Sequence, residues 1–477
     1  MGFFDFFDLA PKASPTPNVH SLLPPPTTKQ PELDVSFDLT LAHPSQRTPL
    51  NCTHAPVRSS SHYPLPVIPL ELVISILECA YYDNDHNTVN TNFLRTCSLV
   101  CRSWRLPSQK LLFTDVTLRT QTAYGSFRKA VNRNSATGRI LGDSVLRLHV
   151  TIDHNQPYSL SQRSFAHAVT LCPNLYELSL ALYGSNPSSA FDETTLDLLH
   201  SGPRITALHF SNWSNDQDCV YSLLGEWSTT LKSLSLSGTP PSPLVHPSVD
   251  STITPLRCSL EELRMNFQVE PSLGFMKWLL DNSINTLRIV ELERDPSVAF
   301  LEYLVETHAE TLHSLALPNP PNCSTTGNSP AAEYSHILER CRNLREVRLE
   351  RCGQAGLKEV IRVMSDDVEH LAVGIDADSS LQPILEAVKS RDKLKTVTLH
   401  LWEGANRHIY AGQRYIHGQG QLAPLKMACA FRGVELRVTS DIRVFRTLVR
   451  GDFVPPSMMV FPRVKSIDNL RYMRLRS

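Results

Sequence analysis

Ten short apolar triplets of the form Leu-x-x-Leu-x-Leu, with other apolar residues as substitutes, recur through more than half of this 477-residue chain. Their central residues run from Leu148 to Val397, at a mean spacing of about 28 residues. Such a repeat predicts one strand and one helix per unit, each unit stacked on its neighbours to bury a shared core. The triplets are Val145/Leu148/Val150, Leu175/Leu178/Leu180, Ile205/Leu208/Phe210, Leu231/Leu234/Leu236, Leu260/Leu263/Met265, Ile284/Leu287/Ile289, Leu312/Leu315/Leu317, Leu344/Val347/Leu349, Val368/Leu371/Val373 and Leu394/Val397/Leu399.

Segments with a helical period of apolar residues lie between the triplets. Each would pack its apolar face against the strands and turn its polar face outward. Strand, helix and strand in one direction give parallel pairing, so we expect an α/β fold with parallel strands on a concave face and helices on the convex face. The segments are 165–169, 195–199, 220–224, 275–280, 298–305, 334–341, 357–364 and 384–388.

One repeat unit carries the sharpest family signal. Leu344-Arg345-Glu346-Val347-Arg348-Leu349-Glu350-Arg351-Cys352-Gly353 resembles a leucine-rich repeat of the cysteine-containing subclass, with Cys352 at the ninth position. The array as a whole is similar to the leucine-rich repeats of F-box receptors, although most units have neither Asn nor Cys at that position. An ordinary α/β domain with alternating strands and helices therefore remains an alternative at this stage.

A second apolar pattern precedes the array, between residues 68 and 113. Apolar residues recur at helical spacing from Leu72 to Ala80 and from Phe93 to Trp104, which predicts two short helices. The apolar sides of two helices this short cover each other only in part. The remaining apolar surface, rimmed by Glu71 and basic residues, has the composition of a protein-binding patch.

This pattern resembles the F-box, the helical module by which substrate receptors join SCF-type cullin ubiquitin ligases. Ile68-Pro69-x-Glu71-Leu72 and Ile76-Leu77 are similar to the opening of the family motif. Cys97-Ser98-Leu99-Val100-Cys101-Arg102-Ser103-Trp104 and the following Leu112 to Val116 are similar to F-box proteins of mushroom-type fungi. The chain departs from the family in a polar insert at 82–92. By this resemblance the adaptor-binding residues would be Ile68, Pro69, Leu72, Ile76, Leu77, Leu99, Val100, Trp104 and Leu112.

These patterns divide the chain into four regions. Residues 1–63 are rich in Pro, Ser and Thr and are expected to be disordered, with the Phe3 to Phe7 cluster as a candidate linear motif. Residues 64–118 form the F-box-like module and 140–403 the repeat array. Residues 404–477 are expected to form a cap, in which Leu436 belongs to a final strand, followed by a basic tail.

Composition narrows the compartment and the partners. A net charge of −1 gives no general attraction to nucleic acid, and no apolar run is long enough to span a bilayer. The N-terminus lacks the features of a secretory signal, and 11 scattered cysteines suit a reducing environment. We therefore expect a cytosolic or nuclear protein that binds neither membrane nor, as a rule, nucleic acid.

No pattern typical of catalysis is found. The chain has no phosphate-binding glycine loop, no Gly-x-Ser-x-Gly elbow and no His-Glu-x-x-His motif. Cys97 and Cys101 stand four residues apart but have no matching His or Cys pair, so buried thiols are favoured over a zinc site. We expect no catalytic residues, no cofactor and no metal.

Residues that follow the central triplet positions should face the concave side, because strand side chains alternate. Arg264, Arg288 and Arg348 fall at such positions and predict a basic stripe for an acidic or phosphorylated partner segment. The alternative is a mixed-charge face in which Glu262 and Glu346 pair these arginines. Two functions stay open: a substrate-recognition subunit that joins a Skp-type adaptor, and through it a cullin, to an unknown protein substrate, or an interaction scaffold unconnected with ubiquitylation.

Overall fold

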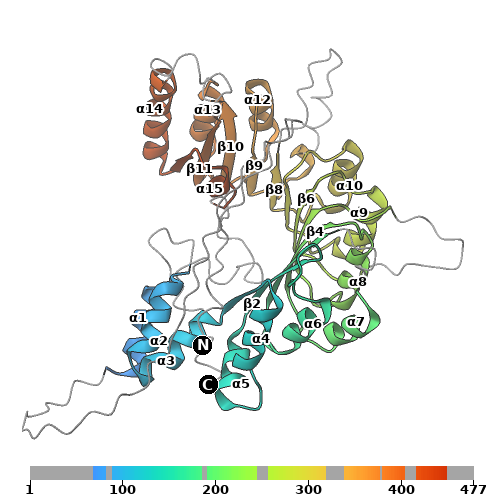
Figure 1. Cartoon of the computed structure of the whole chain (residues 1–477). Helices are drawn as coiled ribbons and strands as arrows, with labels where there is room; N and C mark the ends of the chain where they lie inside the picture. Colours follow the sequence, from blue (N-terminus) through green and yellow to red (C-terminus); the bar gives the residue numbers. More distant parts are fainter. Residues whose placement is uncertain are drawn as a thin grey trace, which may run out of the picture.

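The computed structural model describes residues 68–81, 89–184, 191–243, 256–318, 338–376, 379–402 and 415–447. Within these ranges twelve strands form one sheet in strict sequence order, every pair parallel. The sheet bends into an arc with helices on its outer face (Figure 1). The chain therefore has the α/β architecture of a leucine-rich-repeat solenoid, as the triplets predict.

The strands are short and follow the chain from one end of the arc to the other. They are β1 (Asp115–Leu118), β2 (Arg147–Asp153), β3 (Glu177–Gly184), β4 (Ala207–Ser214), β5 (Ser233–Gly238), β6 (Glu262–Phe267), β7 (Ile289–Leu292), β8 (Ser314–Leu317), β9 (Glu346–Leu349), β10 (His370–Asp376), β11 (Thr396–Trp402) and β12 (Glu435–Thr439).

Helices precede the sheet, connect its strands and end the described part of the chain. They are α1 (Leu70–Cys79), α2 (Thr91–Val100), α3 (Arg102–Leu112), α4 (Gln121–Ala130), α5 (Ala136–Ser144), α6 (Gln162–Thr170), α7 (Glu193–His200), α8 (Cys219–Glu226), α9 (Leu273–Leu280), α10 (Val298–His308), α12 (Gln354–Val363), α13 (Gln382–Ser390), α14 (Tyr415–Arg432) and α15 (Ile442–Thr447), with a 3-10 turn η1 (Asp281–Ser283).

The strand register aligns the central triplet residues in one buried row. Leu148, Leu178 and Leu208 are direct partners, and the row continues along the sheet. One unit was assigned wrongly from the sequence: Leu263 pairs with Val290, not with Leu287. The sheet also extends beyond residues 140–403, because β1 pairs with β2 and Leu436 of β12 pairs with Val397.

Several connecting helices begin at a side chain that closes their first turn. The hydroxyls of Ser161, Ser272 and Ser297 each accept a hydrogen bond from the backbone N–H three residues on, and so does the carboxylate of Asp192. These N-caps satisfy donors that the helix cannot satisfy itself. The helices of these repeat units thus begin at defined residues, although the units differ in length.

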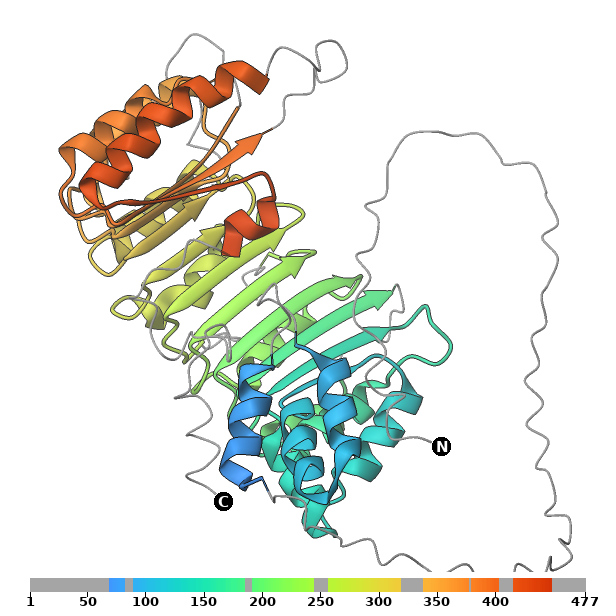
Figure 2. The ribbon, with the colours of Figure 1, turned by 90° about the vertical axis from the view of Figure 1, so that its left-hand side faces the viewer.

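The helical module (α1 to α3) contains one helix more than the sequence predicted. The expected helix from Phe93 to Trp104 is divided at Cys101, whose extended backbone (φ −161°, ψ 173°) ends α2 and begins α3. Val73, Leu77 and Leu94 of the module belong to the same buried apolar cluster as the sheet. The module therefore packs against the first end of the solenoid (Figure 2).

Some sequence predictions lie outside the described residues. They are the N-terminal segment 1–63 with its Phe cluster, most of the insert at 82–92, and the basic tail beyond 447.

Candidate interaction surfaces

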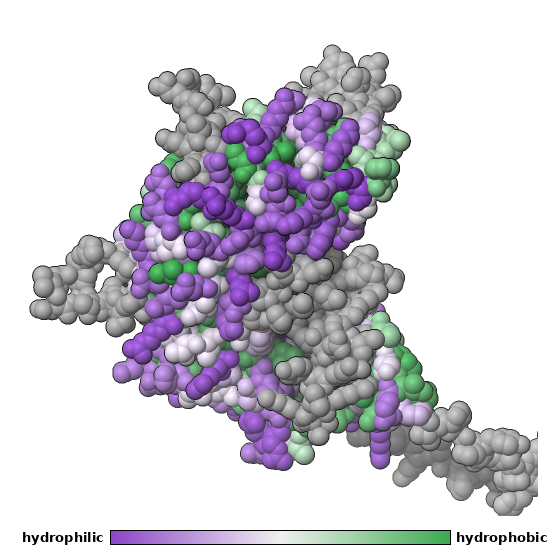
Figure 3. Space-filling model, turned by 180° about the vertical axis from the view of Figure 1, so that it is seen from behind, coloured by the Kyte–Doolittle hydropathy of each residue, from purple (hydrophilic) through white to green (hydrophobic). Residues whose placement is uncertain are grey.

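The helical module has an exposed apolar face. Leu99 and Val100 at the end of α2 are 71% and 61% exposed, and Leu72 of α1 is 55% exposed. A contiguous group of exposed large apolar side chains marks a candidate binding surface. The name apolar face is used below for the exposed side chains Ile68, Leu72 and Ile76, which follow one side of α1, together with Leu99 and Val100 at the end of α2; Leu70 is exposed as well, on another side of α1. In Figure 3 apolar side chains gather over this module at the lower right.

The structure separates the predicted adaptor-binding residues into surface and core. Ile68, Pro69, Leu72, Ile76, Leu99 and Val100 are all exposed. Leu77 and Leu112, by contrast, are 0% and 3% exposed, so they support the module from inside and cannot be contact residues in this state. Trp104 is half-buried and packs against the core. Leu70 is exposed but was missed, since it occupies the variable position of the motif.

The rim of the apolar face carries charge of both signs. Glu71 and Arg102 are exposed, as is Arg105 one turn further along α3. Cys101 lies between the two helices, and its sulfur is 3.0 Å from the Ser103 hydroxyl. This hydrogen bond lowers the pKa of the Cys101 thiol, which increases the fraction of the reactive thiolate at a given pH.

The concave face is the second candidate surface, and the side chains on its first half are partly exposed. Small side chains line it from β3 to β5, among them Ser179, Ser235 and the hydrogen-bonded pair Ser211 and Ser237, whose oxygens are 2.7 Å apart. Tyr183 and Trp213 are register partners at the ends of β3 and β4, 39% and 40% exposed. This half thus has a shallow floor with two aromatic rings at one edge.

Acid–base pairs cross the same face near the start of the strands. Asp115 contacts Arg147 at 3.0 Å and His149 at 3.1 Å, and Glu177 contacts His209 at 3.1 Å. Burial alone would raise the pKa of both carboxyl groups. The histidine hydrogen bonds and the neighbouring cations outweigh burial and lower both pKa values, so the carboxylates stay ionised at neutral pH.

The predicted basic stripe is not present as three free arginines. Arg264 pairs with Glu262 and, at 3.2 Å, with Glu291. Arg348, which is 2% exposed, lies 3.6 Å from Glu291. The mixed-charge alternative is therefore correct for these two, and Glu291 is the acid that contacts both.

The sequence prediction assigned Arg288 to the wrong position relative to its strand. It precedes β7, and the residue level with Arg264 is Glu291. Because the true triplet is shifted by three residues, an acid occupies the concave position assigned to a base.

The second half of the concave face is covered by the chain itself. Helix α15 lies across the strands in Figure 2, and Arg446 forms ion pairs with Glu293 after β7 and Glu350 after β9. Phe445 is fully buried and packs against Ala372 of β10. No local sequence pattern indicates these contacts, which join residues 96 and 153 positions apart.

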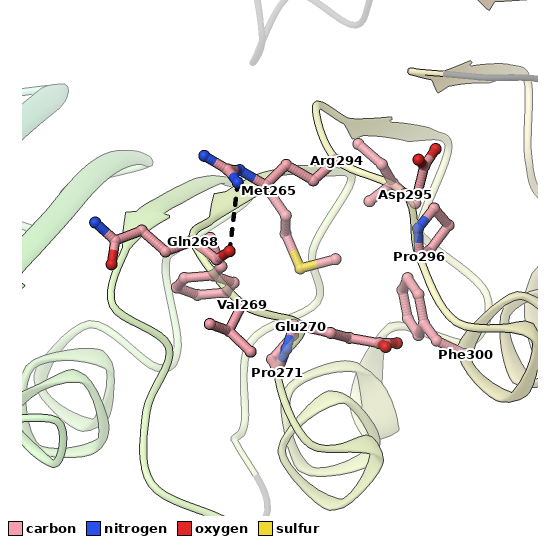
Figure 4. Close-up of a pocket in the computed structure, with 11 residues that line it drawn as sticks. Met265, Gln268, Val269, Glu270, Pro271, Arg294, Asp295, Pro296 and Phe300 are labelled. Carbon is pink, nitrogen blue, oxygen red and sulfur yellow. Dashed lines mark hydrogen bonds between the residues drawn. The ribbon is translucent and has the colours of Figure 1, made fainter. Parts of the chain in front are cut away.

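A small hollow lies beside the ends of β6 and β7 (Figure 4), with a volume of about 140 Å³. Its apolar floor includes Met265 and Phe300, and Glu270, Arg294 and Asp295 lie at its polar edge. Arg294 donates a hydrogen bond to the Gln268 carbonyl oxygen at 3.3 Å. The hollow can take one apolar side chain but not a typical small-molecule ligand, which needs several hundred Å³.

Other kinds of site are not found in the described part of the chain. No group of three or more His, Cys, Asp or Glu side chains in these ranges is arranged to hold a metal ion. None of the helices in the same ranges has both the length and the apolar character needed to cross a bilayer. The surfaces described above are therefore the candidate functional sites.

Comparison with known proteins adds little to the geometry. The chain matches no protein-family model, and a search of curated proteins likewise gives no match. Among solved structures it is similar to that of a TLR13–ssRNA13 complex, with 14% identity and a TM-score of 0.29, over 54% of this chain and 33% of that one. The chain thus matches about a third of that protein. The solenoid assignment rests on the strand register and helix placement described above.

Proposed function

We propose that this protein is a substrate-recognition subunit of an SCF-type cullin ubiquitin ligase. The apolar face of α1 to α3 would bind a Skp-type adaptor, and through it a cullin, while the concave face holds a target protein. The chain contributes proximity and orientation, and its partners carry out the bond-forming chemistry. The resemblance of residues 68–116 to F-box proteins of mushroom-type fungi supports the proposal, which places the protein in the cytosol or nucleus.

The observation that carries the proposal is the exposure of Leu99 and Val100, at 71% and 61%, in a module with a well-filled core. Val73, Leu77 and Leu94 are each 0% exposed, so the module has the apolar residues it needs for packing. The apolar side chains of the apolar face lie outside this core, and a bound partner would remove them from water.

The test is co-expression of the full chain with a Skp-type adaptor, followed by affinity capture. We expect Leu99→Asp and Val100→Asp to abolish capture, because a charge would enter an apolar contact. Val269→Asp is the matched control, since Val269 is 67% exposed on the array, far along the chain from the module. Capture that survives Leu99→Asp and Val100→Asp would exclude the apolar face as the adaptor site.

The alternative is an interaction scaffold that delivers nothing for ubiquitylation. The same arrangement of two surfaces supports it, so capture by the adaptor does not separate the two functions. The lifetime of a bound partner does: it lengthens in the Leu99→Asp variant if the protein is a ligase receptor, and it is unchanged for a scaffold.

A further inference from the structure

The Arg446 side chain is held by three charge-assisted hydrogen bonds on the concave face. Its Nε and Nη2 donate to the two carboxylate oxygens of Glu350, both at 2.7 Å, and its Nη1 donates to Glu293 at 2.6 Å. Arg348 donates to the backbone carbonyl of Arg446 at 3.0 Å. A bidentate contact with a carboxylate favours the planar guanidinium of arginine over the ammonium group of lysine.

The preceding residue occupies an apolar seat beside these acids. Phe445 is 0% exposed and packs against Ala372, which is also 0% exposed. Its ring lies 5.4 Å from the ring of His400 of β11. Because Ala372 has only a methyl group, it leaves room for a large ring above the sheet. The seat thus accepts an aromatic side chain followed directly by an arginine.

The acids that hold Arg446 are in excess over the bases around them. Glu291 already contacts Arg264 and Arg348, so Glu293 and Glu350 depend on Arg446 for their ion pairs among the described residues. The pKa of Glu293 is raised, chiefly by burial; the charges of Arg446 and, less strongly, Arg348 lower it, whereas those of Glu350 and Glu291 raise it. Without Arg446, both carboxylates would lose their ion-pair partner while still repelling each other in a partly buried site, which costs free energy.

Helix α15 has only six residues, Ile442–Thr447. A helix of this length is not stable by itself, so its position depends on its tertiary contacts. The contacts described for it are those of Ile442, Phe445 and Arg446. A segment held by so few side chains is exchangeable against another segment that offers the same two groups.

We infer that the seat formed by Glu293, Glu350 and Ala372 recognises a partner protein segment with an aromatic residue followed by arginine, and that α15 is its intramolecular competitor. This deepens the proposed function, on which it rests for calling that partner the target. An acidic or phosphorylated segment, or a nucleic acid, would be repelled by the same carboxylates.

The test uses a fluorescent peptide of residues 440–447, with blocked ends, and the full-length chain. The double variant Phe445→Ala/Arg446→Ala lacks the two side chains that fill the seat. We expect fluorescence anisotropy to show that it binds the peptide at least tenfold more tightly than the wild-type chain does. Peptides with the Phe replaced by Ala, or the Arg by Gln, should bind at least tenfold more weakly. Added salt should weaken the complex because the contact is ionic.

A third substitution shows whether the peptide occupies the seat. Adding Glu350→Gln to the double variant should abolish peptide binding, whereas adding Glu386→Gln, on the outer helix α13, should not. Melting curves with and without peptide show that each variant is folded. We expect the peptide to raise the melting temperature of the double variant but not that of the wild type. No binding to the folded double variant, or binding unaffected by Glu350→Gln, overturns the inference. The assay contains no adaptor, so it can fail while adaptor capture succeeds, and the reverse.

Discussion

His308 is predicted to make the stability of the solenoid sensitive to mild acid. It is the last residue of α10 and is fully buried, with its ring 6.2 Å from that of Tyr303 in an edge-on arrangement. Burial lowers the pKa of His308 from 6.5 to about 4. The unfolded chain therefore binds a proton below pH 6.5 that the folded chain does not bind until about pH 4.

Protonation of His308 favours the unfolded chain, so acid destabilises the fold. Above pH 6.5 His308 is neutral in both states and costs nothing, and stability is lost as the pH falls from 6.5 to about 4. The full penalty for a shift of this size is about 3 kcal/mol, of which about 1 kcal/mol has developed at pH 5.5. Other buried histidines titrate as well, so the contribution of His308 is obtained by difference.

The measurement is urea unfolding at pH 7.5 and pH 5.5 for the wild type and His308→Leu. We expect the wild type to lose about 1 kcal/mol more than the variant over this interval. Leu304→Met, a volume-conserving change in the same helix that removes no titratable group, is the control and should keep the wild-type pH dependence. Equal losses in the wild type and His308→Leu would refute the reasoning, because His308 would then titrate alike in both states.

Three further predictions concern the backbone, a thiol and the apolar face. Gly238→Ala should lower the free energy of unfolding by about 1–3 kcal/mol in urea, because φ is +93° there and a Cβ would collide with the Asn212 carbonyl oxygen. Iodoacetamide should label Cys101 faster than the buried cysteines, as mapped by peptide mass spectrometry, and Ser103→Ala should slow this labelling because it removes the contact that lowers the Cys101 pKa. Leu99→Ala should change the free energy of unfolding, measured in urea, by no more than about 0.5 kcal/mol, since the side chain is 71% exposed. A larger change would mean that the apolar face is needed for folding.

The repeat register could be predicted because each unit repeats the same burial problem. Where the prediction was wrong, the sequence allowed two solutions. Between Ile284 and Leu292 the pattern Leu-x-x-Leu-x-Leu occurs twice, once centred on Leu287 and once on Val290. Local periodicity cannot choose between them, and pairing with Leu263 selects Val290.

Two other features lay beyond local patterns. The division of the second helix at Cys101 leaves the apolar periodicity of α2 and α3 almost unchanged, so the spacing of Phe93 and Trp104 did not reveal it. The covering of the concave face depends on contacts between Arg446 and residues 96 and 153 positions away. No window of the sequence contains both partners, so only the fold brings them together.

The continuous apolar core between the helical module and β1 has a mechanical consequence. Leu111 and Phe113, at the end of α3, belong to the same buried cluster as Val116 and Leu148 of the first two strands. The two parts thus meet through packed side chains, without a hinge at this boundary, and packed interiors resist deformation. Partners bound to the module and to the arc would therefore be kept at a set separation and angle. Inserting a flexible linker between α3 and β1 would abolish this fixed geometry.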